Sequence, residues 1–158
     1  WPPNFSTIPS NFDKAVSMAV KAGFSNQGQI YLCGSRLFVQ DEIYEKFKKA
    51  LIEKVSKLKV GDPQDNDVDL GAIVSKEHMN KVLSKIIQAK KLGGNILIGG
   101  NRKLLEGDLS NGYYIEPTVI ENLPFDCKVN QEEIFGPVLT LIPFKDEEEV
   151  VSMANSTK

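Results

Sequence analysis

The chain has 158 residues, a length that suits a single domain with a buried core of its own. With 41% apolar residues, 25% charged residues and a net charge of −2, the composition is that of an ordinary globular protein and predicts neither a nucleic-acid nor a membrane partner. No apolar run is long enough to span a bilayer, and two cysteines are too few for a disulfide framework, so we expect a reducing, cytoplasmic location.

Two helices and one strand are predicted in the first part of the chain. Asn11 is a good N-cap, and apolar residues recur at helical spacing from there towards Phe24. The segment 36–40 is short and β-prone, which indicates a strand. Asp41 is expected to cap a second amphipathic helix, which the Gly-Asp-Pro sequence at 61–63 ends.

The middle of the chain predicts a helix followed by a strand. Ser75 is expected to cap the helix, and the glycine pair at 93–94 ends it. The continuous apolar run 96–98 suits a buried strand. Residues 99–112 are mostly glycine, asparagine and charged residues, which indicates a loop.

The last part of the chain predicts two strand regions and a short helix. Residues 113–120 are strand-like, although Pro117 indicates an edge or an interruption. Residues 138–144 give the strongest strand pattern of the sequence. A helix is expected to begin near Asp146, with Glu149 placed for a capping box.

Helices that alternate with short apolar strands predict an α/β fold with a largely parallel sheet flanked by helices. In such a sheet a ligand is expected beside the carboxyl ends of the strands. The chain begins with Trp1 rather than Met, and residues 153–158 follow an apparent helix without a stop signal. We therefore expect a domain that is truncated at both ends.

Generic motifs give no function. The sequence has no G-x-G-x-x-G fingerprint, no P-loop and no G-x-S-x-G elbow. One histidine and two well-separated cysteines do not form a zinc site, so no metal is predicted.

Two longer segments do point to a chemistry. Phe24–Arg36 reads FSNQGQIYLCGSR, and Gln131–Val138 reads QEEIFGPV. The first resembles the active-site segment of NAD(P)-dependent aldehyde dehydrogenases, in which an aromatic residue and Asn-Gln-Gly-Gln lead to a cysteine two places further on. The second is similar to that family's Glu-Glu-Ile-Phe-Gly-Pro segment. The resemblance covers essentially the whole chain, from residue 3 to residue 155.

The resemblance implies a fold of the aldehyde dehydrogenase catalytic-domain type, with residues 1–158 forming part of that domain and the dinucleotide-binding domain absent. Enzymes of this family oxidise aldehydes to carboxylic acids with NAD or NADP through a cysteine thiohemiacetal. The full-length parent is expected to be a homo-oligomer that acts on a small-molecule aldehyde. Because the cofactor domain and the general base lie outside these residues, we expect the chain alone to be inactive and not to bind the cofactor tightly.

Tyr31 stands at the position of the family's nucleophilic cysteine. A phenol is scarcely ionised at neutral pH, so only the backbone N–H of Tyr31 keeps a family role, as an oxyanion donor. The alternative reading makes the side chain an apolar plug near the end of a helix. Cys33 would lie about 6–7 Å further along an extended segment, too far to replace the nucleophile, and Cys127 has no motif support.

Three residues match family positions that contact the cofactor. They are Glu133 for the nicotinamide ribose, Phe135 beside the nicotinamide, and Lys81 near the ribose. Each also has a structural reading: Glu133 in a capping box with Asn130, Phe135 in the core, and Lys81 as a solvated helix residue. His78 falls where the family often has glutamine and is read as a surface histidine.

The sequence leaves three hypotheses open, and with them the question of whether this chain is an enzyme. The chain is part of an NAD(P)-dependent oxidoreductase, or it is a non-catalytic homologue with a binding or structural, crystallin-like role. In the third hypothesis Tyr31 is a substitution introduced into an otherwise ordinary enzyme.

Overall fold

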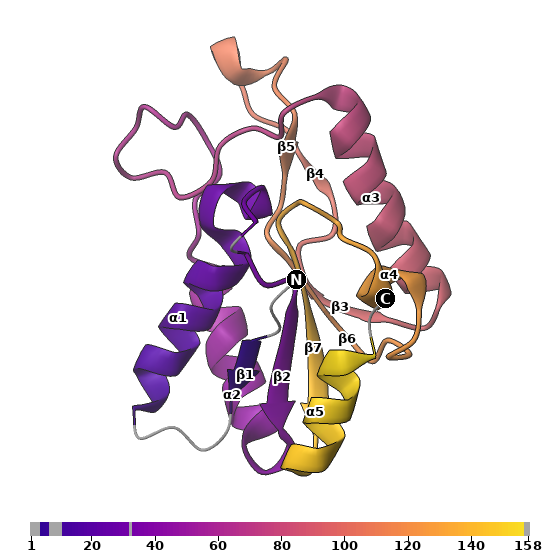
Figure 1. Cartoon of the computed structure of the whole chain (residues 1–158). Helices are drawn as coiled ribbons and strands as arrows, with labels where there is room; N and C mark the ends of the chain where they lie inside the picture. The colour runs from indigo at the N-terminus through magenta and orange to yellow at the C-terminus, as the bar shows by residue number, and fades with distance from the viewer. Residues whose placement is uncertain (1–3, 7–10, 32, 157–158) are drawn as a thin grey trace.

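A computed structural model of the chain describes residues 4–6, 11–31 and 33–156, with side chains from residue 11 onward. A five-stranded sheet lies at its centre in the order β1-β2-β7-β6-β3, with helices on both faces (Figure 1). β1, β2, β7 and β6 pair in parallel, and β3 pairs antiparallel with β6 at one edge. The predicted α/β fold with a largely parallel sheet flanked by helices is confirmed.

The strands and helices have the following bounds. The central strands are β1 (Asn4–Ser6), β2 (Arg36–Gln40), β3 (Asn95–Ile98), β6 (Thr118–Glu121) and β7 (Val138–Phe144). The α-helices are α1 (Phe12–Phe24), α2 (Asp41–Val55), α3 (Lys76–Lys91), α4 (Lys128–Gln131) and α5 (Glu147–Asn155). A small antiparallel pair, β4 (Arg102–Lys103) and β5 (Tyr114–Ile115), and two 3-10 turns, η1 (Ser25–Gly28) and η2 (Gly107–Leu109), complete the described part of the chain.

The sheet is buried on both faces because helices cover each of them. α1 and α2 cover one face, α3 packs on the other over β6, and α5 covers that second face over β2 and β7. Under α1 and α2, the strand residues Leu37, Val39, Val119, Leu139 and Leu141 meet the helix residues Val16, Val20, Phe47, Leu51 and Val55. Strands buried on both faces are nearly continuously apolar, which is why 138–144 gave so clear a pattern.

Helix starts were predicted well where a polar side chain bonds its own neighbours. The side chains of Asn11, Ser75 and Asp146 each accept a hydrogen bond from the backbone N–H three residues later, as expected of N-caps. Asp41 as a cap is wrong. β2 runs directly into α2, so Gln40 is the N-cap and Asp41 is already helical, in the first turn, where a carboxylate favours the helix dipole.

Other boundaries differ because the tertiary arrangement decides them. α2 ends at Val55, ahead of the predicted stop at 61–63. Residues 96–98 form a half-buried strand rather than a buried one, because β3 lies at the edge of the sheet. Pro117 interrupts the strand region between β5 and β6, as predicted. None of the helices in the described ranges has the length and apolarity needed to cross a membrane.

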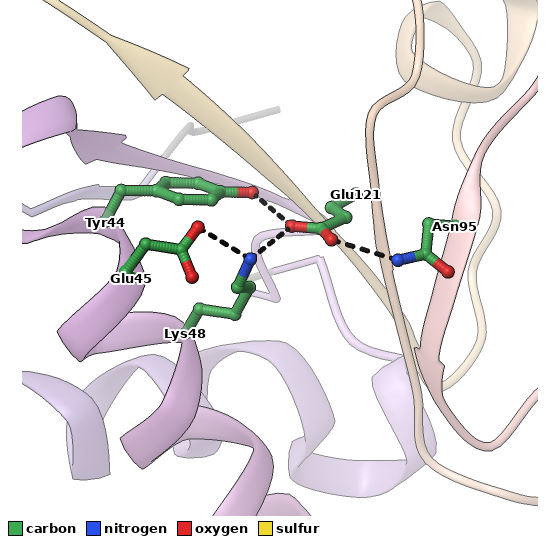
Figure 2. A network of polar contacts seen from close by, with 5 residues as sticks. All are labelled: Tyr44, Glu45, Lys48, Asn95 and Glu121. Atoms are coloured by element: carbon green, nitrogen blue, oxygen red, sulfur yellow. Dashed lines mark hydrogen bonds and ion pairs between the residues drawn. The ribbon is translucent and has the colours of Figure 1, made fainter.

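A polar network around the buried Glu121 fastens α2 to β3 at the carboxyl end of β6 (Figure 2). The Glu121 carboxylate accepts hydrogen bonds from Tyr44 Oη at 3.0 Å, Lys48 Nζ at 3.1 Å and Asn95 Nδ2 at 3.0 Å. Lys48 also pairs with Glu45 at 2.8 Å. Burial alone would raise the pKa of Glu121, but these three donors outweigh it and lower that pKa below its ordinary value.

Candidate functional site

The segment that precedes Tyr31 leaves α1 through a left-handed turn. Asn26, Gln27 and Gly28 have φ values of 50°, 57° and 68°, a region that glycine adopts freely and that asparagine tolerates. Asn26 Nδ2 donates to Gln29 O at 3.0 Å, and the backbone N–H of Gln29 donates to Asn26 O at 2.9 Å. The turn therefore carries the chain away from α1 and on towards Tyr31 and β2.

The two motif segments meet at a glycine pair. A Cβ atom on Gly28 would lie 2.1 Å from the carbonyl oxygen of Gly136, so a larger residue does not fit there. A Cβ atom on Gly136 would in turn lie 2.7 Å from a methyl group of Val82 on α3. The first contact packs the first motif on the second, and the second contact packs the second motif on α3. Together they set the positions of Tyr31 and Phe135.

Tyr31 lies at the surface of the described structure. The residue is 83% exposed, and its ring meets the Phe135 ring, with centroids 5.7 Å apart. The interpretation of Tyr31 as an apolar plug is therefore wrong. The left-handed turn places Tyr31 outside the core, ahead of β2, rather than at the buried end of a helix.

The three predicted cofactor residues line one pocket. A cavity of about 580 Å³ lies between α3 and the segment ahead of β7, and Lys81, Glu133 and Phe135 all contribute to its wall. Lys81 and Glu133 are exposed, and neither has an ion pair or hydrogen bond within the described part of the chain. Both charges are therefore available to a ligand.

The same pocket carries an ion pair on its rim. Lys85 of α3 donates to the Glu132 carboxylate. This hydrogen bond and the charge of Lys85 lower the pKa of Glu132. Lys85 is thus already paired, in contrast to Lys81.

His78 is a pocket residue that the sequence interpretation did not assign to the site. It lines the pocket, it is half-buried, and its Nε2 lies 2.6 Å from the carbonyl oxygen of Phe135. The two rings also meet edge-on, with centroids 6.1 Å apart. His78 is therefore half-buried rather than simply solvated, and its contact with a residue 57 positions away leaves no trace in local periodicity.

The capping-box reading of Glu133 is also wrong. Asn130 lies inside α4, is buried, and donates through Nδ2 to Pro124 O at 3.1 Å. The N-cap of α4 is Cys127. Glu133 is therefore free of a capping role, and Phe135 is half-buried at the pocket rather than in the core.

The site lies at the amino ends of the parallel strands. Tyr31 comes ahead of β2 and Phe135 ahead of β7, and these two strands are neighbours in the sheet (Figure 1). These candidate residues therefore do not lie at the carboxyl ends of the strands, where a ligand was expected, and the expectation about the ligand stays a prediction. The motif segments here are the loops that enter the strands, because the glycine contact joins them on that side.

The cysteines do not replace a nucleophile at this site. Cys33 is buried, and its Sγ donates to Ser25 O at 3.3 Å. Burial raises the pKa of the Cys33 thiol, although a backbone hydrogen bond with Ile30 acts in the opposite direction. Cys127 is half-buried at the start of α4 and does not line the pocket. Among the described residues no group of three His, Cys, Asp or Glu is placed to hold a metal ion.

Comparison with known proteins extends these observations. The model of the aldehyde dehydrogenase family matches residues 7–158. The chain is 42% identical over 151 residues to the 2-aminomuconic semialdehyde dehydrogenase of Mus musculus, and the match covers 94% of this chain and 31% of that protein. It is 44% identical over 147 residues to aldehyde dehydrogenase B of Escherichia coli (strain K12), and this match covers 93% of this chain and 28% of that protein.

The fold is shared with a solved structure. The chain is similar to betaine aldehyde dehydrogenase from Staphylococcus aureus in complex with NAD+, with a TM-score of 0.93 and 40% identity over 98% of this chain and 30% of that one. It spans less than a third of the length of these relatives. The resemblance predicted from the two motif segments is confirmed, and the chain belongs to the aldehyde dehydrogenase family.

Proposed function

We propose that this chain is part of the catalytic region of an NAD(P)-dependent aldehyde dehydrogenase, and that the pocket beside α3 receives the nicotinamide-ribose end of the cofactor. One observation carries the proposal. Lys81, Glu133 and Phe135, which are separated by up to 54 positions, line the same cavity of about 580 Å³. The Staphylococcus aureus structure with NAD+ supports the choice of cofactor class.

The chemistry of the pocket fits such a ligand. A carboxylate such as Glu133 is an acceptor for the two hydroxyl groups of a ribose, and the Lys81 ammonium supplies donors only. The Phe135 ring offers a flat apolar surface beside them. A bound NAD(P)+ supplies the hydride acceptor for aldehyde oxidation.

In the proposed parent reaction, a thiolate attacks the aldehyde carbon and a new C–S bond forms. The carbon then loses a hydride, which oxidises it to a thioester, and water releases the carboxylic acid and restores the thiol. Tyr31 supplies no thiolate, and its phenol has no hydrogen bond or ion pair among the described residues. We therefore propose that the 158 residues alone do not oxidise aldehydes.

The backbone can still take part at this position. The N–H of Tyr31 is proposed as an oxyanion donor, since a backbone donor does not depend on the side chain. The parent is further proposed to be a cytoplasmic homo-oligomer that acts on a small-molecule aldehyde and binds neither nucleic acid nor a membrane. The two free cysteines support the proposed location, and the net charge of −2 supports the proposal that nucleic acid and membranes are not partners.

A second function is favoured by Tyr31 itself. An exposed tyrosine at the nucleophile position, with no activating partner among the described residues, suits a homologue that keeps the fold for a binding or structural, crystallin-like role. In a third case the tyrosine was introduced into an ordinary enzyme. The codon at position 31 in the gene of the parent tests this third case. A cysteine codon there would support an introduced tyrosine, and a tyrosine codon would contradict it.

The decisive experiment changes Tyr31→Cys in the full-length parent and measures NADH formation from a panel of aldehydes. Tyr31→Ser is the matched control, because it removes the phenol without adding a thiol. We expect activity from the cysteine variant and none from the serine variant. If the cysteine variant binds NAD+ and yet forms no NADH, the enzyme assignment of the parent is wrong.

For the 158-residue chain alone, calorimetry is expected to detect no NAD+ binding, and micromolar affinity would contradict the proposed absence of a cofactor domain.

A further inference from the structure

Phe135 has a backbone conformation that needs support from its surroundings. Its φ is 55°, in the left-handed region that a bulky residue adopts only when the surrounding structure imposes it. The neighbours of Phe135 are fixed on both sides. Ile134 is buried in the core beside α3, and Gly136 lies so close to Val82 that no Cβ atom fits between them. These anchors hold the flanking residues, but among the described residues neither of them donates a hydrogen bond to Phe135 O.

His78 supplies the missing contact. Its Nε2 lies 2.6 Å from Phe135 O, and because a carbonyl oxygen only accepts, Nε2 must carry the proton. His78 is itself well fixed. Its backbone N–H donates to Ser75 Oγ at 3.1 Å in the first turn of α3, and the next residue, Met79, is buried. The hydrogen bond therefore connects a rigid helix start to the strained peptide group.

The Phe135 ring has an aromatic neighbour on α3 and another ahead of β2. The His78 ring meets it at 6.1 Å and 70°, and the Tyr31 ring meets it at 5.7 Å and 49°. Both arrangements are tilted or edge-on, as aromatic pairs prefer. Because the ring is attached to the strained residue, a change in the backbone of Phe135 moves the ring relative to Tyr31 and to the pocket.

We propose that His78 is a positioning residue, which holds Phe135 in its left-handed conformation and thereby fixes the place of the Phe135 ring in the pocket. The consequence for cofactor binding rests on the proposed function of the pocket. The structural part of the proposal does not, since it concerns contacts within this chain alone.

The test uses the fact that His78 is the only histidine of the sequence. Its imidazole nitrogen signals in a ¹⁵N NMR spectrum are therefore assigned without ambiguity. We expect the neutral ring to be the Nε2–H form, with its proton in a hydrogen bond. A neutral ring protonated on Nδ1 would overturn the proposal without any substitution being made.

Two variants separate the hydrogen bond from the bulk of the side chain. His78→Gln keeps an N–H donor, and His78→Leu removes it. Asn80→Ala is the matched control, because Asn80 lines the same pocket and, among the described residues, has no hydrogen bond to Phe135. The readouts are the strong contact between HN and Hα of Phe135 that a positive φ produces, and the contacts between the Tyr31 and Phe135 rings. We expect both in the wild type, in His78→Gln and in Asn80→Ala, and neither in His78→Leu.

If His78→Leu retains both signals, the proposal is wrong. If His78→Leu does not fold, the other two measurements still test the proposal. A wild-type ring protonated on Nδ1, or a His78→Gln variant that lacks both Phe135 signals, would contradict it. In the full-length parent, His78→Leu is expected to weaken NAD+ binding about five- to tenfold, the equivalent of one hydrogen bond, and His78→Gln to restore it. A parent that binds no NAD+ in any variant counts against the proposed function only, because the NMR signals of Phe135 are judged separately.

Discussion

Replacing Gly28 by alanine is expected to damage the contact on which the whole site depends. At Gly28 an added methyl group meets two separate obstacles. The backbone φ is +68°, a conformation that L-residues other than glycine rarely adopt. The methyl carbon would also lie 2.1 Å from Gly136 O and 2.6 Å from Gly136 C, which are backbone atoms that cannot rotate away.

The two obstacles have different magnitudes. The left-handed conformation costs a non-glycine residue about 1–2 kcal/mol, and over-packing against a fixed neighbour costs a further 1–3 kcal/mol, so we expect a total loss of about 2–5 kcal/mol. Gly93→Ala is the matched control. Gly93 has a φ of +88° and nothing within 4 Å of an added Cβ, so it reports the conformational cost alone. The difference between the two variants measures the close approach of the two motif segments.

Urea unfolding followed by circular dichroism measures both variants on the same scale. We expect Gly28→Ala to lose about 1–3 kcal/mol more than Gly93→Ala, the part of the cost that comes from over-packing. If the two losses are equal, the methyl group meets no obstacle beyond its φ, and the packing of the first motif on Gly136 is wrong. The contact between the Tyr31 and Phe135 rings should weaken in Gly28→Ala as well, because Gly136 has to move and Phe135 precedes it.

Three further predictions test other parts of the structure. Glu121→Gln is expected to cost about 1–3 kcal/mol, because the new amide places a donor against Tyr44 and Lys48. The folded-state pKa of Glu121 is lowered, so the stabilisation by the Glu121 carboxylate is present above its ordinary pKa of 4.5 and is lost as pH falls through the folded-state pKa. Urea unfolding between pH 7 and pH 3 should therefore show a smaller fall in the free energy of unfolding in Glu121→Gln than in the wild type. In the 158-residue chain, Tyr31→Cys should give a thiol that reacts with a disulfide reagent at the rate of an exposed cysteine, whereas the thiol of Cys33 reacts slowly, and equal rates would contradict the burial of Cys33. Asn11→Ala should cost about 1 kcal/mol through loss of the α1 cap, and an unchanged urea midpoint would show that the cap contributes nothing.

The features that the sequence predicted are those whose physics is local. An N-cap bonds a backbone group three residues away, so Ser75 and Asp146 could be identified from their immediate neighbours. Strands buried on both faces are apolar throughout, which made β7 easy to place. Asp41 was misplaced by one residue because a strand that runs directly into a helix leaves no loop in which a cap can be recognised.

The features that the sequence did not predict depend on contacts between distant segments. The hydrogen bond from His78 to Phe135 joins α3 to the loop ahead of β7, and no periodicity of either segment encodes it. Gln27 belongs to the same class. In the amide orientation that satisfies both its polar atoms, its side-chain oxygen accepts from the backbone N–H of Gly71 at 2.6 Å, which ties the left-handed turn to the start of the next segment.

The structure also separates the scaffold of the site from its chemistry. The scaffold consists of the contact between Gly28 and Gly136, the packing of Gly136 on Val82, and the hold of His78 on Phe135, and none of these contacts involves the Tyr31 side chain. A side chain that is 83% exposed contributes little to folding, so tyrosine and cysteine at this position are expected to give the same fold with similar stability. If Tyr31 stands at the nucleophile position, as proposed, its exchange therefore leaves the rest of the pocket under no structural pressure to change. In the proposed function, Lys81, Glu133 and Phe135 would keep their arrangement around the pocket whether or not the chain catalyses, so NAD+ binding and NADH formation by the parent have to be measured as two separate properties.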